Sequence, residues 1–129
     1  HLQLVPNARW EEGRSTSIEA GAAAFVEREP LGVLVVAVDQ PLERDVVERL
    51  IAARPEAGEV IVPQHGGRRG HPVLLAGSLL AQLGRATQFP EGLRDIVRGA
   101  RLRLVEVANA AIHLDLNDEQ ALVTAEGQR

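Results

Sequence analysis

The hydrophobic pattern of the chain centres on an uncharged run from Gly32 to Val38, in which four of the seven residues are valine. A continuous apolar run of this length, rich in β-branched residues, predicts a strand buried on both faces. The strand should end at Asp39, because Pro41 has no N–H to donate to a ladder. Ligands of open α/β sheets bind outside the carboxyl ends of the strands, so Asp39 is a candidate site residue. The alternative is a turn aspartate that accepts local backbone N–H bonds.

Helical and extended patterns alternate along the rest of the chain. Helical spacing predicts helices over about 18–29, 43–54, 79–84, 90–98 and 119–125. Ser15, Thr16 and Ser17 are N-cap candidates for the first of these helices. Short apolar or alternating runs predict strands over 2–5, 60–62, 102–107 and 111–114, with 73–75 packed into the core. The alternation predicts one α/β domain over 1–129, with a largely parallel sheet covered by helices.

Composition narrows the class of protein. A chain of 129 residues has room for one domain, and an aromatic content of 2% means that leucine, valine, isoleucine and alanine must fill the core. A net charge of −4 argues against nucleic-acid and anionic-membrane partners. There is no run of apolar residues long enough for a membrane span and no signal peptide, so we expect a cytoplasmic domain. Trp10, the sole tryptophan, is expected to pack its loop down, although stacking on a base would produce the same pattern.

Candidate binding chemistry lies in the segment from Gln64 to Pro72, which holds three glycines, two arginines and two histidines. Glycine permits close approach of the backbone to a ligand, and adjacent arginines can grip phosphate or carboxylate. All 14 basic residues are arginine, so side-chain cations that contact phosphate must come from this residue type. The segment follows a strand at the same edge as Asp39, which favours binding over a solvated hairpin-like connection.

A second polar cluster runs from Asp115 to Glu119. Asn117 or Asp118 suits the N-cap of the last predicted helix. One of these oxygens could equally reach a metal ion held by Asp39.

Three motifs together resemble the molybdenum-cofactor nucleotidyltransferases, and among them the cytidylyltransferases most. They are Val38-Asp39-Gln40-Pro41-Leu42, Gly66-Gly67-Arg68-Arg69-Gly70-His71-Pro72-Val73-Leu74 and Glu91-Gly92-Leu93-Arg94. Asn7, Trp10, Gly13 and Ser17 also match an Asn…Trp…Gly…Ser segment of that family. The resemblance extends from Leu4 to Leu122, and the GGRRGHP run is its most specific part.

The resemblance implies a Rossmann-like three-layer sandwich of the nucleotide-diphospho-sugar transferase type, and transfer of CMP from CTP to molybdopterin with release of pyrophosphate. Asp39 is then the catalytic residue and an Mg²⁺ ligand. Asn117 falls on the second metal ligand of the family, at a position where an acid is common. The implied partners are a nucleoside triphosphate, CTP above others, and a phosphorylated pterin-like acceptor. The segment expected to lie against the acceptor consists of Gly66, Gly67, Arg68, Arg69, Gly70, His71 and Pro72.

One element of the family has no counterpart in the sequence. The glycine-rich loop that holds the triphosphate, Gly-Gly-x-Ser-x-Arg-Met-Gly-x-x-Lys, is absent. We therefore expect either a piece of a longer polypeptide or a truncated member that has lost triphosphate chemistry. Activity is expected only where that loop is supplied. The rival interpretations are a non-catalytic α/β domain that binds a partner through the arginine segment, and a relative with an accessory or oxidoreductase role.

The resemblance also implies that the first two strands of the family's sheet have no counterpart here, because the sequence begins where the third would be. Without them the strand from Val33 to Val38 has an unpaired, apolar edge, which invites association. We expect this edge to be covered by residues preceding His1, by a second copy of the chain, or by the segment from Leu2 to Val5.

Overall fold

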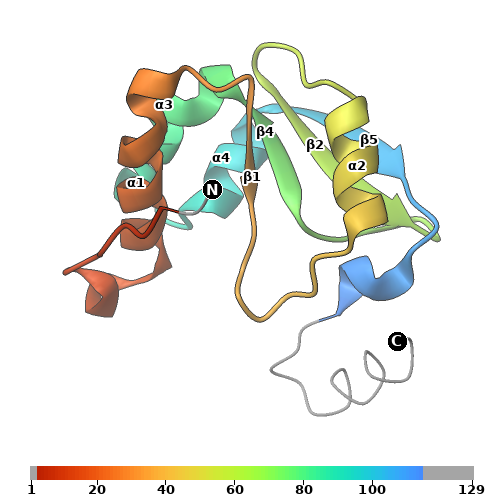
Figure 1. Ribbon diagram of the computed structural model, residues 1–129, viewed down its shortest axis with the longest axis horizontal. Coiled ribbons are helices and arrows are strands. Elements are labelled where there is room, and N and C mark those ends of the chain that lie inside the picture. Colours follow the sequence, from red (N-terminus) through yellow and green to blue (C-terminus); the bar gives the residue numbers. More distant parts are fainter. Residues whose placement is uncertain (1–2, 115–129) are drawn as a thin grey trace.

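A computed structural model describes residues 3–114 of the protein and shows a five-stranded sheet flanked by helices (Figure 1). The strands are β1 (Gly32–Val35), β2 (Glu59–His65), β3 (Arg68–Arg69), β4 (Val73–Ala76) and β5 (Arg101–Glu106). The α-helices are α1 (Arg14–Phe25), α2 (Arg44–Ala52), α3 (Leu80–Leu83) and α4 (Leu93–Gly99). Five 3₁₀ turns join them: η1 (Trp10–Glu12), η2 (Val26–Arg28), η3 (Gly77–Leu79), η4 (Ala86–Gln88) and η5 (Ala110–His113). In this part of the chain, no helix has the length and apolarity that a membrane crossing needs.

The sheet is mixed, where the sequence pattern predicted a largely parallel one. β2 pairs in parallel with β5, but β4 runs antiparallel to both β1 and β2, and β3 runs antiparallel to β2. The reason is the short connection between β2 and β4. A parallel return needs a crossover of a dozen or more residues, whereas a hairpin needs very few. Residues 66–72 therefore reverse the chain and lay β4 antiparallel beside β2.

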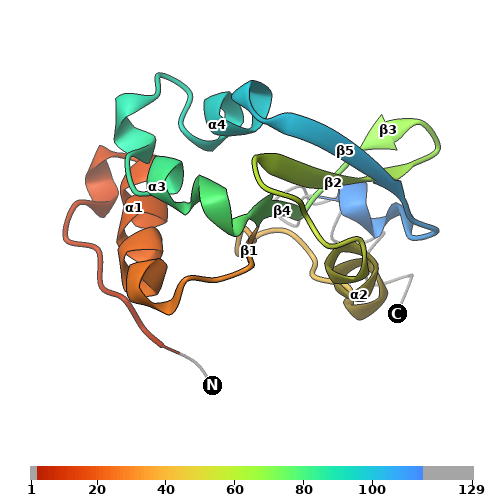
Figure 2. The ribbon, with the colours of Figure 1, turned by 90° about the horizontal axis from the view of Figure 1, so that it is seen from above.

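Helices cover both faces of this sheet because successive strand residues point to opposite sides. Val60 and Val62 of β2 and Leu75 of β4 pack with residues of α1, α3 and α4. Ile61 of β2 and Leu74 of β4 pack on the other face, against Val46 and Leu50 of α2 and Ile112 of η5. Figure 2 shows α2 and α4 on opposite sides of the sheet. The three-layer α/β/α arrangement expected from the sequence is confirmed.

Pro63 lies inside β2, where the predicted strand had already ended. A proline inside a strand removes a ladder hydrogen bond, unless no neighbouring strand needs an N–H donor at that position. The carbonyl of Pro63 accepts the N–H of Gly70 at 2.9 Å, so this residue is turned away from β5. The ladder with β4 has already ended at Ile61. The missing N–H therefore costs β2 no bond to β5, and the strand continues to His65.

The expected central strand is shorter and less buried than predicted. β1 ends at Val35 and its four residues are half-buried, while Val38 is fully exposed. Within residues 3–114, β1 pairs only with β4, so it is an edge strand. An edge strand loses the burial that a second neighbour would provide, which explains the difference.

Three further expectations were wrong. Gly13 occupies the N-cap of α1 without a side-chain capping bond, and the Thr16 hydroxyl, with the carbonyls of Gly13 and Arg9 at 2.7 and 3.0 Å, donates back to the backbone. Residues 3–5 form no strand and Leu4 is 86% exposed, so they do not cover β1. Trp10 is 68% exposed and does not pack its loop down.

Residues 111–114 also differ from the predicted last strand. The Asn109 side chain accepts the N–H of Ala111 and caps the 3₁₀ turn η5. Two of its apolar residues are buried all the same, since Ala111 and Ile112 are both 2% exposed. A run of four residues does not separate a strand from a turn by its period, and the Asn109 cap decides the conformation.

The two edges of the sheet differ in charge. β5 carries Arg101, Arg103 and Glu106, and charges discourage pairing with another strand. β1 carries none, and it is followed by the exposed Val36 and Val38. We predict that the β1 edge is covered in solution, either by a second copy of the chain or by polypeptide that precedes His1.

Sedimentation and mass measurement test this prediction. The 129-residue chain should sediment as a species heavier than 13.9 kDa, and Val36→Lys should shift it towards the monomer because a lysine on the edge opposes pairing. Leu104→Lys, at the opposite edge, is the matched control and should change nothing. A stable monomer with rapidly exchanging β1 amides would show that the open edge is tolerated.

A second prediction concerns pH. The carboxylate of Glu19 in α1 accepts both the N–H and the hydroxyl of Thr87 in η4, and these bonds hold the pKa of Glu19 below its ordinary value of 4.5. A lowered folded-state pKa adds stability above the ordinary value, and this stability is lost as the pH falls through the lowered pKa. The free energy of unfolding, measured with urea between pH 6 and 3, should therefore fall less steeply with pH in Glu19→Gln than in the unmodified protein. Thr87→Val removes one donor and should flatten the slope in part; an unchanged slope in both variants would contradict the coupling.

Candidate functional site

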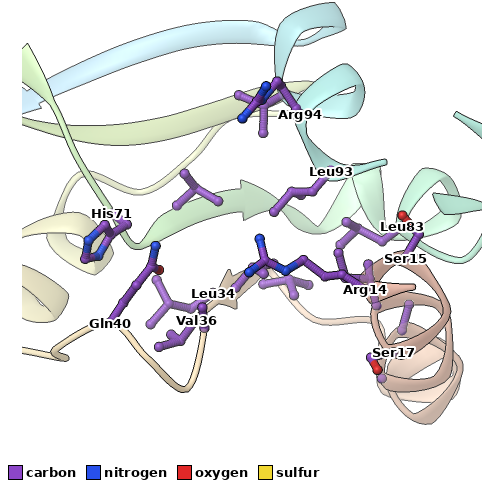
Figure 3. A pocket seen from close by; sticks show the side chains of 18 of the residues that line it. Arg14, Ser15, Ser17, Leu34, Val36, Gln40, His71, Leu83, Leu93 and Arg94 are labelled. Carbon is purple, nitrogen blue, oxygen red and sulfur yellow. The ribbon is translucent and has the colours of Figure 1, made fainter. Parts of the chain in front are cut away.

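A groove of about 940 Å³ lies between α1, β1 and α4, along the open edge of β1. Its apolar walls come from these three elements, and the residues that carry them include Ile18, Val33, Val35, Leu93 and Val97. Polar side chains gather at its ends and rim (Figure 3). Gln40 and His71 lie at one end, Arg14 extends inward from α1, and Arg94 lies on the rim formed by α4. The groove therefore has apolar walls and a few separated polar groups, the usual composition of a small-molecule site.

The start of α1 is held by Asn7, one of the residues that carry the family resemblance. The Asn7 amide donates to the hydroxyl oxygens of Thr16 at 2.8 Å and Ser17 at 2.9 Å. Gly13 precedes the helix at φ 121°, a value that favours glycine. Thr16 is 3% exposed, and its hydrogen bond with Asn7 is partly buried. The motif thus fixes the end of α1 that places Arg14 and Ser17 at the groove.

The GGRRGHP segment is a β-hairpin followed by a close backbone contact. Gly66 and Gly67 form a two-residue connection between His65 and Arg68, with φ of 60° and 77°. Positive φ at both central residues is what a type I′ hairpin turn requires, and glycine meets it without strain. Gly70 then lies so close to η5 that an added Cβ would stand 2.5 Å from the carbonyl oxygen of Ile112.

His71 is positioned by the same contact with η5. Its backbone N–H donates to the carbonyl of Ile112 at 3.0 Å, and its ring Nε2 lies 2.8 Å from the carbonyl of Leu114. A carbonyl oxygen only accepts, so Nε2 carries the proton. The peptide bond from His71 to Pro72 is cis. The hydrogen bonds to Ile112 and Leu114 therefore fix the backbone and the ring of His71 at the groove.

The two neighbouring histidines serve as structural ties. His65 Nδ1 donates to the carbonyl of Val107 at 2.9 Å, and His113 Nε2 donates to the carbonyl of Arg68 at 2.9 Å. The two rings are 6.1 Å apart. In residues 3–114 no group of three or more His, Asp or Glu side chains is placed to hold a metal ion. Any metal site must therefore draw on few protein ligands from this part of the chain.

Asp39 lies in the turn after β1 and is half-buried. Its neighbour Gln40 lines the groove, whereas Asp39 itself does not. We expected Asp39 and the segment from Gly66 to Pro72 to line one crevice. Of these residues only Gly70 and His71 line the groove, and Gln40 lines it in place of Asp39. Asn117, the expected second metal ligand, and the cluster at 115–119 lie outside the described residues.

The rest of the segment points elsewhere. Gly66, Gly67, Arg68 and Arg69 are exposed and do not line this groove, and Pro72 is buried. The exposure expected for the tip of the segment is thus confirmed.

Sequence reasoning missed the roles of Arg14, Gln40 and Arg94 in the groove. Two of them stood within the motifs that carry the resemblance, Gln40 in VDQPL and Arg94 in EGLR, so the signal was present. Arg14 stood in no motif. It reaches the groove because Gly13 and Asn7 set the direction of α1.

The mixed sheet with a helical layer on each face makes this an α/β protein, consistent with a nucleotide-sugar transferase-like fold. The chain belongs to the MobA-like NTP transferase domain family, whose sequence model matches residues 1–107. A similar solved structure is that of a Mycobacterium tuberculosis Rv0371c homolog from Mycobacterium sp. strain JC1, with a TM-score of 0.67 and 21% identity. The similarity covers 89% of this chain and 57% of that one, so the chain spans little more than half of that structure's length. No curated protein matches the chain significantly.

The contact at Gly70 provides a stability prediction. Gly70→Ala should lower the free energy of unfolding by about 1–3 kcal/mol, because the new methyl group collides with both the carbonyl oxygen and the buried side chain of Ile112. Gly21→Ala is the matched control. Gly21 lies inside α1 with nothing within 4 Å of an added Cβ, so alanine there should stabilise the protein by about 0.5–1 kcal/mol. Urea denaturation measures both, and equal effects would contradict the contact with η5.

Proposed function

We propose that this chain forms the acceptor-binding part of a nucleotidyltransferase that transfers CMP from CTP to molybdopterin or a similar phosphorylated pterin. The observation that carries the proposal is the end of the groove beyond β1, where Gln40 of the Asp39 turn and His71 of the GGRRGHP segment lie together. These residues belong to the two motifs most characteristic of the family. A volume of about 940 Å³ suits a ligand of the size of a pterin.

The reaction places particular demands on such a site. An oxygen of the acceptor phosphate forms a bond to the α-phosphorus of CTP, while the bond from that phosphorus to the pyrophosphate oxygen breaks. Pyrophosphate carries the electron pair away as an anion. A phosphate nucleophile is already ionised at neutral pH, so the protein contributes by positioning the reactants and neutralising charge rather than by removing a proton.

The role of His71 follows from this requirement. Its Nε2–H donates to the Leu114 carbonyl, which fixes the orientation of the ring. Because the phosphate nucleophile carries no proton that must be removed, we assign His71 to positioning the acceptor or anchoring its own segment rather than to general-base catalysis.

Asp39 is the proposed ligand for Mg²⁺. Members of this family generally use divalent metals. Mg²⁺ is commonly held by one or two carboxylates, with waters and substrate phosphates completing its shell. A half-buried carboxylate in a turn beside the groove fits this donor set, although it supplies only one oxygen group from residues 3–114. When bound, the ion would neutralise the developing charge on the phosphates. Asn117 remains the proposed second ligand.

Titration of a fluorescent CTP analogue with and without Mg²⁺ tests the proposal in the full-length protein. Asp39→Asn should reduce the Mg²⁺-dependent part of the affinity by about tenfold or more, a loss of roughly 1.4 kcal/mol. It should leave thermal unfolding nearly unchanged, because a carboxylate in this turn is not part of either hydrophobic core.

Glu27→Gln is the matched control, since it removes an exposed carboxylate of η2 and should leave CTP binding intact. Pyrophosphate release on addition of molybdopterin should accompany binding. With the glycine-rich triphosphate loop supplied, CTP affinity that ignores Mg²⁺, together with no pyrophosphate release, would reject the transferase. The chain would then be a non-catalytic domain that binds through the same groove.

A further inference from the structure

A second cavity of about 330 Å³ lies beside the main groove, where β3, α4 and the start of β5 meet. Half of the residues that line it are arginines: Arg69 from β3, and Arg94 and Arg98 from α4. The others are Val97, Ala100 and Leu102. Arg94 and Arg98 are four residues apart on one helix and therefore share a face. The cavity thus combines a concentrated positive charge with an apolar base.

The three arginines differ in the charge that surrounds them. Arg98 donates to Glu91 at 3.0 Å and to Asp95 at 3.1 Å, so two carboxylates already neutralise it. Arg69 and Arg94 form no ion pair with any carboxylate of residues 3–114. Both are exposed, yet they line one small cavity together. Like charges held close together repel each other, and an anion between them would remove that cost.

We propose that Arg69 and Arg94 form a binding site for the phosphate of a phosphomonoester whose organic part occupies the main groove. Two guanidinium groups present two forks of donors, which match the oxygens and the double charge of a phosphate better than those of a single carboxylate. Arg94 lines both cavities, so a ligand held there at its phosphate can extend directly into the main groove. Leu93 lines the main groove near Arg94, and His71 lines its far end (Figure 3).

The assignment separates two arginines that are neighbours in the sequence. Successive residues of a strand point to opposite sides, and Arg69 lines the cavity while Arg68 lines neither cavity. The backbone carbonyl of Arg68 accepts from His113, so its contribution is to hold η5 against the hairpin. The adjacent arginines of GGRRGHP therefore have different roles.

This inference rests on the proposed function only in taking the ligand to be the phosphorylated acceptor rather than the nucleotide. The anion site itself can be tested without any nucleotide. A suitable probe is phenyl phosphate, which joins a phosphomonoester to a flat apolar ring, and phenol is the uncharged comparison.

Isothermal titration of the full-length protein with phenyl phosphate at low ionic strength should show saturable binding that weakens with salt. Arg69→Gln and Arg94→Gln should each weaken it by about tenfold or more, and the double variant should abolish it, because each removes one fork of donors. Arg68→Gln is the matched control, since it removes the same charge one residue away, and its affinity should stay within about twofold. Phenol should show no saturable binding. All three altered side chains are exposed, and circular dichroism would verify that the variants fold.

Two results would overturn the inference. If Arg68→Gln weakens binding as much as Arg69→Gln does, the effect comes from diffuse surface charge rather than from a site. If the unmodified protein shows no saturable binding, there is no anion site at all. A protein that binds phenyl phosphate through Arg69 and Arg94 but ignores CTP and Mg²⁺ would reject the proposed transferase and retain the anion site.

Discussion

The burial of β2 on both faces is the constraint on which the rest of the structure depends. Val60 and Ile61 are fully buried on opposite sides of this strand, so each helical layer has an apolar surface to pack against. β5 occupies one edge of β2 along its length, while β4 and β3 share the other. Because β2 is held on all four sides, the turn that follows it starts from a fixed position. That position in turn fixes where the hairpin and His71 lie.

The GGRRGHP segment shows how one short motif can serve structure and binding together. Its first two glycines make the turn, and Gly70 allows the backbone to approach η5 at Ile112. The approach brings His71 to the groove, and the turn places Arg69 in the second cavity. Three of its seven residues are therefore glycines for geometric reasons, and the chemical groups between them are positioned by those glycines. A motif of this kind is specific because few other residues fit the backbone.

Several elements were predictable because their local pattern agreed with their tertiary environment. α2 has apolar residues at helical spacing on the face that packs against the sheet, and the predicted helix differs from it by one or two residues at each end. β1 and η5 were mispredicted because their apolar residues do not reveal their neighbours. A valine-rich run is compatible with a central or an edge strand, and only the pairing with β4 alone made β1 an edge. In η5, the Asn109 cap overrode an extended pattern.

The sequence by itself determined the α/β class, the family and the motifs that reach the groove, because periodicity and short glycine-rich turns are local properties. Tertiary structure alone decided the mixed direction of the sheet, the open edge of β1 and the association of Arg69 with Arg94. Those two arginines are 25 positions apart in the sequence, and no local pattern relates them. They meet because β3 folds back along β2 while α4 leads into β5 on the other edge of the same strand. Long-range pairing, which sequence spacing does not encode, creates the site.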